Sequence, residues 1–187
     1  MFTPFVVVAI VVIVLLVMLV GTYNRLVALR QNANNAFADI DVQLKQRQDL
    51  VPNLVETVKG YAAHERGTLD EVTAARAQAA SANTVEGKVQ AENALTGALG
   101  RLFAVAEAYP DLKANQNFLQ LQGQLADIEN KLAAARRFFN NAVAEFNAQA
   151  QRFPAVLFAA AMGFTQRAFF DLGEDRAAAS AAPQVKF

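Results

Sequence analysis

The chain has 187 residues, and its 17 basic and 17 acidic side chains give a formal net charge of zero. This balance, without a dominant basic stretch, argues against nucleic acid as a partner. The sequence contains no cysteine, which excludes disulfides, thiolate metal sites and a cysteine nucleophile.

Residues 1–21 are predicted to form a transmembrane anchor. Every residue from Phe5 to Val20 is apolar, and such a run can cross the hydrocarbon core of a bilayer as a helix. A cleaved signal peptide is the alternative. The missing basic n-region, the length of the run and the lack of a small-residue cleavage site after Val20 count against it. The anchor residues expected to face lipid are Phe5, Val8, Val12, Leu15, Leu16 and Leu19.

Flanking charges predict the orientation of this anchor. No basic residue precedes the apolar run, whereas Arg25 and Arg30 follow it closely. The positive-inside rule therefore favours an orientation with the N-terminus outside and the rest of the chain in the cytoplasm.

After Gly21 the pattern becomes that of an amphipathic helix with no loop signal. Apolar positions alternate in steps of four and three, the spacing of a helix that packs against other helices. We expect one helix to continue from the anchor to about His64. Its predicted core stripe is Leu26, Ala33, Phe37, Ile40, Leu44, Arg47, Val51, Leu54, Val58 and Tyr61.

Pro52 disturbs this stripe because proline lacks a backbone N–H and clashes with the preceding helical turn. The stripe keeps its phase on both sides of Pro52, which favours a kink within one helix. The alternative is a new helix that starts here, with Asp49 as its N-cap and Pro52 in its first turn.

Arg47 occupies a core-facing position and is a candidate buried charge. A buried guanidinium needs a partner, which Glu107 or Glu129 of a facing helix could supply. An equally weighted alternative is that the Arg47 side chain extends to the edge of the bundle and keeps its charge in water.

The middle of the chain is predicted to form two further helices. Gly67 marks a break, and Thr68 with Glu71 fits a capping box that starts a helix running to about Ala80. Residues 81–84 are predicted to form a loop. The next helix is expected over residues 85–109 and ends at Pro110.

The clearest pattern predicts a last long helix that starts near Asp111 or Asn115 and ends before Pro154. Residues 155–164 are nearly all apolar but too few to span a bilayer. We expect them to cap the end of the bundle; the alternative is that they lie in the membrane interface beside Phe169 and Phe170. Residues 171–187 read as a disordered tail. The core stripe of the last helix is Phe118, Leu121, Leu125, Ile128, Leu132, Ala135, Phe139, Ala142 and Phe146.

These elements predict an all-α fold: an N-terminal transmembrane helix that continues into an antiparallel bundle of three or four long helices, with residues 22–170 as one bundle domain. The sequence offers no catalytic constellation. The single histidine, His64, has Tyr61 in place of the glutamate that a Glu-x-x-His metal motif requires, and no Ser-His-Asp arrangement is available. We therefore expect no enzymatic activity, no cofactor, no metal and no small-molecule substrate.

One helix-to-helix turn is more polar and aromatic than a short connection needs to be. It contains the candidate interaction residues Tyr109, Pro110, Asp111, Lys113 and Asn115. The simpler interpretation is turn chemistry, with Pro110 breaking a helix and Asp111 or Asn115 capping the next.

Several stretches, in order, resemble the LemA family of bacterial membrane proteins. The resemblance implies a single-pass membrane protein with an antiparallel helical bundle and no known catalytic activity. Phe139 departs from it, since the family usually has tyrosine there. The matching stretches are Tyr23-Asn-Arg-Leu-Val27, Ile40 to Val55, Lys59-Gly-Tyr-Ala-Ala-His-Glu65, Leu102 to Asn115 with Asn117-Phe-Leu, Ala135 to Val143, Phe146-Asn147 and Gly163-Phe164.

The leading functional hypothesis is a membrane-anchored scaffold that self-associates and organises or shapes the membrane, with the bilayer and further copies of the chain as partners. The second is an adaptor that docks a membrane protease or signalling protein through the turn at residues 109–117. An enzyme is the weakest hypothesis.

Overall fold

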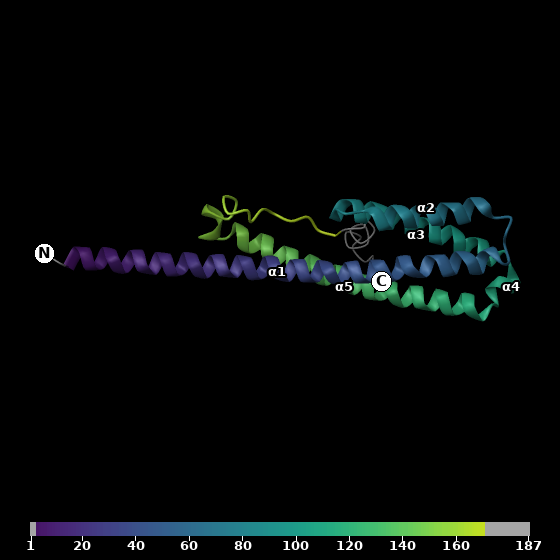
Figure 1. The fold of residues 1–187 in the computed structure, drawn as a ribbon. Helices are drawn as coiled ribbons and strands as arrows, with labels where there is room; N and C mark the ends of the chain where they lie inside the picture. Colours follow the sequence, from purple (N-terminus) through teal and green to yellow (C-terminus); the bar gives the residue numbers. More distant parts are fainter. Residues whose placement is uncertain (1–2, 171–187) are drawn as a thin grey trace, which may run out of the picture. The chain divides into compact units, whose positions relative to one another are not determined.

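The computed structural model describes residues 3–170. Within this range the chain forms five α-helices and one short 3-10 helix, and no strand (Figure 1). This confirms the all-α prediction. The elements are α1 (Thr3–Lys59), α2 (Arg66–Ser81), α3 (Val85–Glu107), α4 (Pro110–Lys113), α5 (Gln116–Gln151) and η1 (Ala155–Leu157). The predicted tail at residues 171–187 lies outside the described residues.

Contacts divide the chain into two compact units. We call residues 3–38 and 137–168 the anchor unit, and residues 39–136 with 169–170 the bundle unit. Both boundaries fall inside long helices, α1 and α5, with no loop at either point. The predicted domain at residues 22–170 therefore contains the bundle unit and most of the anchor unit.

Helix α1 is continuous through Pro52, so the alternative in which Pro52 starts a new helix is wrong. The predicted stripe from Leu26 to Val58, each with 0% exposure, is buried except at Phe37, which is half-buried. The helix ends at Lys59 rather than near His64. Tyr61 consequently lies beyond the helix and is 44% exposed, because the helical phase no longer applies to it.

The continuity of α1 at Pro52 has a side-chain explanation. Pro52 has no N–H, so the carbonyl of Gln48, four residues earlier, loses its helical donor. Arg76 of α2 fills this gap: its Nε donates to the Gln48 carbonyl oxygen at 2.7 Å. A neighbouring helix thus satisfies the backbone acceptor that the proline frees.

The starts of the later helices correct two predictions. Helix α2 begins at Arg66 after Glu65, without a side-chain cap, so the capping box at Thr68 is wrong. Glu71 instead forms an ion pair with Arg101 of α3. Helix α5 is capped by Asn115, whose Oδ1 accepts from the backbone N–H of Phe118 at 3.0 Å, one of the two caps predicted there.

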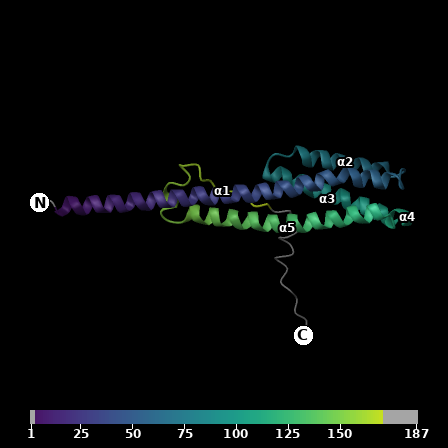
Figure 2. The same ribbon diagram turned by 60° about the horizontal axis from the view of Figure 1, so that its bottom comes forward.

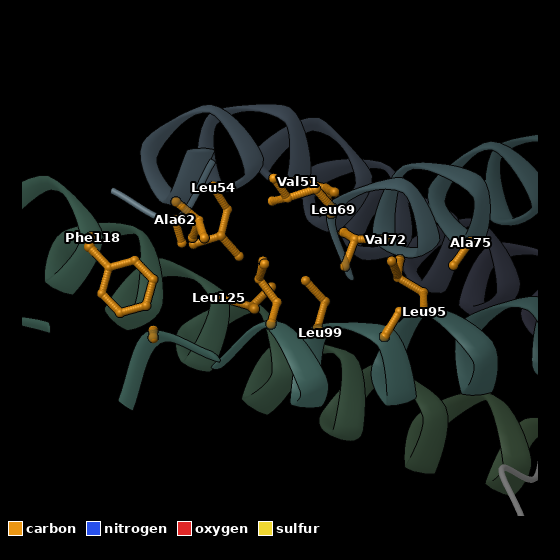
Figure 3. Packing of buried hydrophobic residues seen from close by; sticks show 14 of the residues in the cluster. Val51, Leu54, Ala62, Leu69, Val72, Ala75, Leu95, Leu99, Phe118 and Leu125 are labelled. Carbon is orange, nitrogen blue, oxygen red and sulfur yellow. The ribbon is translucent and has the colours of Figure 1, made fainter. Parts of the chain in front are cut away.

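The core of the bundle unit is formed by α1, α2, α3, α4 and the first part of α5. Figure 3 shows how apolar side chains of these elements point toward one another. Each fully buried leucine or valine contributes about 1.5–3 kcal/mol relative to an exposed one. The side chains labelled there are Val51, Leu54, Ala62, Leu69, Val72, Ala75, Leu95, Leu99, Phe118 and Leu125.

The anchor unit has a smaller core of its own. In this unit α1 and α5 run antiparallel, because Arg25 pairs with Glu145 and Phe37 packs on Phe139. Figures 1 and 2 show the end of α5 beside α1. The segment after α5 completes this core, which contains Leu26, Leu29, Phe146, Ala150, Ala155, Ala159 and Phe164.

Candidate functional sites: apolar helix, buried arginine, polar turn and Phe164 cluster

The first part of α1 is an apolar surface that no described residue covers. Its most apolar 18-residue window has a mean hydropathy of 3.3, and none of that window is buried. The six predicted anchor residues are all exposed, from Leu19 at 40% to Phe5 at 75%. An exposed apolar surface of this size on a folded chain marks contact with a membrane or with another chain. By length and composition, this is the one described helix that could cross a bilayer.

Arg47 lies in the core of the bundle unit with 2% exposure. Its Nη1 is 2.8 Å from Glu92 Oε2 on α3, and its Nη2 is 2.6 Å from Glu129 Oε1 on α5. Nη2 also donates to Thr96 Oγ1 at 2.9 Å. The guanidinium therefore links three helices, α1, α3 and α5. Glu107, the other predicted partner, instead pairs with Lys113.

Glu92 is a buried partner of Arg47 that the sequence pattern did not predict. It is 1% exposed, and its Oε1 also accepts from Gln48 Nε2 at 3.2 Å. Burial raises the pKa of Glu92, and the Arg47 guanidinium opposes that shift. The spacing in the sequence could have indicated that Glu92 is buried, because it lies three residues after Val89 and three before Leu95, on the same apolar stripe of α3.

The predicted interaction turn joins parts of the bundle unit. Asn115 Nδ2 donates to Tyr61 Oη at 2.8 Å, and Tyr109 Oη donates to Glu65 Oε1 at 3.3 Å. Partial burial and the Glu65 carboxylate raise the pKa of Tyr109. Tyr109 and Asn115 thus tie the segment after α1 to the segment around α4.

The remaining turn residues have separate positions. Pro110 is the first residue of α4 and is exposed, as is Asp111. Lys113 forms its ion pair with Glu107 at the surface. Only Leu112 of this helix is buried, with 0% exposure. Pro110, Asp111 and Lys113 are therefore the predicted interaction residues that the bundle unit leaves exposed.

Phe164 organises the core of the anchor unit, and it too was not singled out as a site residue. Its ring centroid lies 5.5 Å from that of Tyr23 in an edge-on contact and 6.4 Å from that of Phe146. The Arg30 guanidinium carbon lies 4.9 Å from the Phe164 centroid, a cation–π distance. Gly163, with φ 77°, adopts the left-handed conformation that the turn before Phe164 requires.

Asn147 fixes the chain beyond Phe164. Its side-chain amide donates to the carbonyl of Arg167 at 3.0 Å and accepts from the N–H of the same residue at 2.9 Å. Arg167 Nη1 in turn donates to Asn34 Oδ1 at 2.6 Å and to the Arg30 carbonyl at 3.3 Å. The segment after α5 is thereby held to both long helices of the anchor unit.

Some of the stretches that carry the family resemblance contact one another within each unit. In the anchor unit Tyr23, Phe146 and Phe164 share one aromatic cluster. In the bundle unit the stretch at 59–65 meets the stretch at 102–115 through Tyr61, Glu65, Tyr109 and Asn115. The pairs are far apart in sequence, and the fold brings them together.

Among residues 3–170, no group of three or more histidine, aspartate or glutamate side chains is placed to hold a metal ion, and His64 is exposed. The described part of the chain is thus an all-helical protein with one candidate membrane span.

The chain belongs to the LemA family, whose sequence model matches residues 36–187. Protein LemA of Metamycoplasma hominis is 29% identical over 139 residues, covering 72% of this chain and 62% of the relative. Magnetosome protein MamQ of Magnetospirillum gryphiswaldense is 25% identical over 174 residues, covering 79% and 64%. The chain spans less than two thirds of the length of these relatives. Their names describe no enzymatic reaction. Family membership and the apolar helix together support a membrane-associated protein.

Proposed function

We propose that this chain is a non-catalytic, membrane-anchored helical scaffold that self-associates and organises or shapes a bacterial inner membrane. The observation that carries this proposal is the wholly exposed apolar stretch of α1. The same helix continues to Lys59, and its buried Arg47 is paired with Glu92 and Glu129 of the bundle unit. The anchor crosses the membrane with its N-terminus outside, since Arg25 and Arg30 follow the apolar run.

The geometry that the anchor imposes supports the proposed self-association. Copies anchored in one bilayer are confined to two dimensions with their anchors parallel, which raises their effective concentration. In the anchor unit a shallow groove of about 350 Å³ runs between α1 and α5. Phe138, which lines it, is 58% exposed, as expected for a side chain that a second copy covers. Asn32, Asn35 and Asn141 in the same groove offer polar contacts.

The adaptor hypothesis has less support. It relied on the turn at residues 109–117, and two of its polar side chains, Tyr109 and Asn115, are engaged inside the bundle unit. Pro110, Asp111 and Lys113 remain exposed there, so a membrane protein partner would dock through these residues.

The test is the mass of the purified full chain in mild detergent, by light scattering. We expect a homo-oligomer that Phe138→Asp reduces to smaller species. The matched control is Leu119→Asp, because Leu119 lies on the same helix with 50% exposure and outside the groove. A wild-type monomer at near-native concentration contradicts the scaffold. Equal effects of the two substitutions contradict the groove as its interface.

A further inference from the structure

The segment after α5, residues 152–164, exposes an unusual amount of apolar surface; we call it the 152–164 loop. Phe153 and Leu157 are each 73% exposed, Val156 is 53% and Met162 is 47% exposed. The much longer stretch 39–136 exposes only three large hydrophobic side chains to a comparable degree, Val42, Tyr61 and Leu119. Contiguous exposed apolar residues of this kind mark a contact surface.

The exposed side chains are held in a fixed orientation. Ala155, Ala159 and Phe164 of the same loop are buried in the core of the anchor unit, with exposures of 0%, 4% and 3%. The loop therefore has one face packed against α1 and α5, and its four large apolar side chains point away from that core. A segment anchored in this way presents its apolar face without a large additional loss of conformational entropy.

The loop lies at the level where the apolar run of α1 ends. Glu145 pairs with Arg25, and α1 and α5 are antiparallel in this unit. Helix α5 continues for six residues beyond Glu145 to Gln151, a rise of about 9 Å. Its end therefore lies near Leu19 and Val20. Figures 1 and 2 show the end of α5 beside α1. At the end of the loop, the ring of Phe164 contacts the ring of Tyr23 on α1.

The surroundings of the loop suit a lipid interface. Tyr23 is 39% exposed at this level, and tyrosine is enriched where membrane meets water. The anchor unit contains five arginines and one glutamate, and one of these arginines, Arg152, is exposed beside Phe153. Basic side chains next to apolar ones favour anionic lipid headgroups.

We propose that the 152–164 loop is a second membrane contact, which lies in the interface of the bilayer that α1 crosses and places Phe153, Val156, Leu157 and Met162 against lipid. This inference rests on the proposed anchor. One helix fixes a protein to a bilayer but leaves it free to rotate and tilt. Two separate contacts from the same unit restrict both motions.

The test uses single-cysteine variants, since the natural chain has no cysteine. The full chain carrying Leu157→Cys is labelled with a fluorophore and reconstituted in vesicles of phosphatidylcholine and phosphatidylglycerol, with and without lipids that bear a nitroxide quencher on the acyl chain. Because interfacial segments lie about 5–10 Å into the headgroup and acyl boundary, we expect the quencher to lower the Leu157→Cys signal about twofold. Val12→Cys in the anchor and Ala144→Cys, exposed on α5 two turns before its end, are the matched controls.

The outcomes separate the inference from the proposed function. Quenching at positions 12 and 157 but not at 144 supports both. Quenching at 12 without quenching at 157 overturns the loop contact and leaves the anchor. A blue-shifted but unquenched label at 157 also overturns it, because a second copy then covers the loop. No quenching at 12 overturns the anchor and the inference with it. Unchanged far-UV circular dichroism shows that each variant is folded.

Discussion

The two units of this protein differ in the sign of their net charge and in the partners of their arginines. The anchor unit has five arginines and one glutamate, whereas the described residues of the bundle unit have ten basic and thirteen acidic side chains. In the anchor unit Arg30 lies over the ring of Phe164, and Arg167 binds Asn34 and a backbone carbonyl. In the bundle unit Arg47 is buried between two carboxylates. Arginine therefore serves two roles here, and its surroundings decide which one.

The two units are therefore stabilised by different interactions. The bundle unit combines a large apolar core with one buried ion cluster, in which the desolvated charges of α1, α3 and α5 are paired with one another. The anchor unit has a small core centred on Phe164 and side-chain hydrogen bonds to backbone. Substitutions can therefore be chosen that affect one unit and spare the other.

Arg47→Ala has the largest expected effect, because it leaves the Glu92 carboxylate buried without its cation. We expect a loss of about 3–5 kcal/mol in the free energy of unfolding, measured by urea denaturation in detergent. The control is Lys45→Ala, whose exposed ion pair with Asp49 contributes less than about 1 kcal/mol. The double variant Arg47→Met/Glu92→Leu should recover most of the loss. Equal effects of Arg47→Ala and Lys45→Ala would contradict this account.

Phe164→Ala should destabilise the anchor unit by about 3 kcal/mol through the cavity it leaves. Hydrogen exchange should then increase at the end of α5 and in the 152–164 loop, while the amides of Leu95 to Leu102 in the bundle unit keep their protection. Phe153→Ala, at a side chain that is 73% exposed, is the control and should change little in detergent. Equal loss of protection in both units would show that they unfold together.

Arg76→Met should cost about 1–2 kcal/mol, because it leaves the Gln48 carbonyl without a donor. Pro52→Ala restores the N–H that this carbonyl lacks. In the Pro52→Ala background the same Arg76→Met change should therefore cost clearly less, and a double-mutant cycle by thermal denaturation measures the difference. Additive effects would mean that Arg76 stabilises the bundle unit by some other contact.

The smallest expected effect is a pH dependence confined to the bundle unit. Burial raises the pKa of Glu92 above its ordinary value of 4.5, so the folded chain binds a proton more readily than the unfolded chain. This group's contribution to stability is present at low pH and is lost as pH rises from about 4.5 through the raised value. Urea midpoints across this range should show the trend, and Glu92→Gln should remove it. A trend that persists in Glu92→Gln must come from another group.

The sequence was sufficient for most of the fold. The apolar stripe from Leu26 to Val58 predicted the buried face of α1, since a helix that packs on neighbours repeats its core positions in steps of three and four. The spacing predicts that α1 extends to about His64, because Tyr61 continues the stripe, although the helix stops at Lys59. The start of α2 was misjudged because Thr68 and Glu71 have the right spacing for a capping box while Glu71 pairs with Arg101.

The candidate sites were less accessible to sequence reasoning. Arg47 could be found because it is a charge in an apolar stripe, and Glu92 occupies an equivalent place on α3. The contact between Arg76 and Gln48 and the cluster around Phe164 depend on which helices become neighbours. Local spacing carries no information about partners so far apart in the chain.

The long sequence separation in the anchor unit has a consequence for synthesis. Arg25 and Glu145 are separated by 120 residues, so the apolar run and Tyr23 leave the ribosome long before Phe146 and Phe164 exist. The α2–α3 hairpin, with its local contacts, can form earlier in translation. The apolar helix is thus available to the membrane before the rest of the anchor unit has been synthesised. Closure of that unit around Phe164 is one of the last steps in making the molecule.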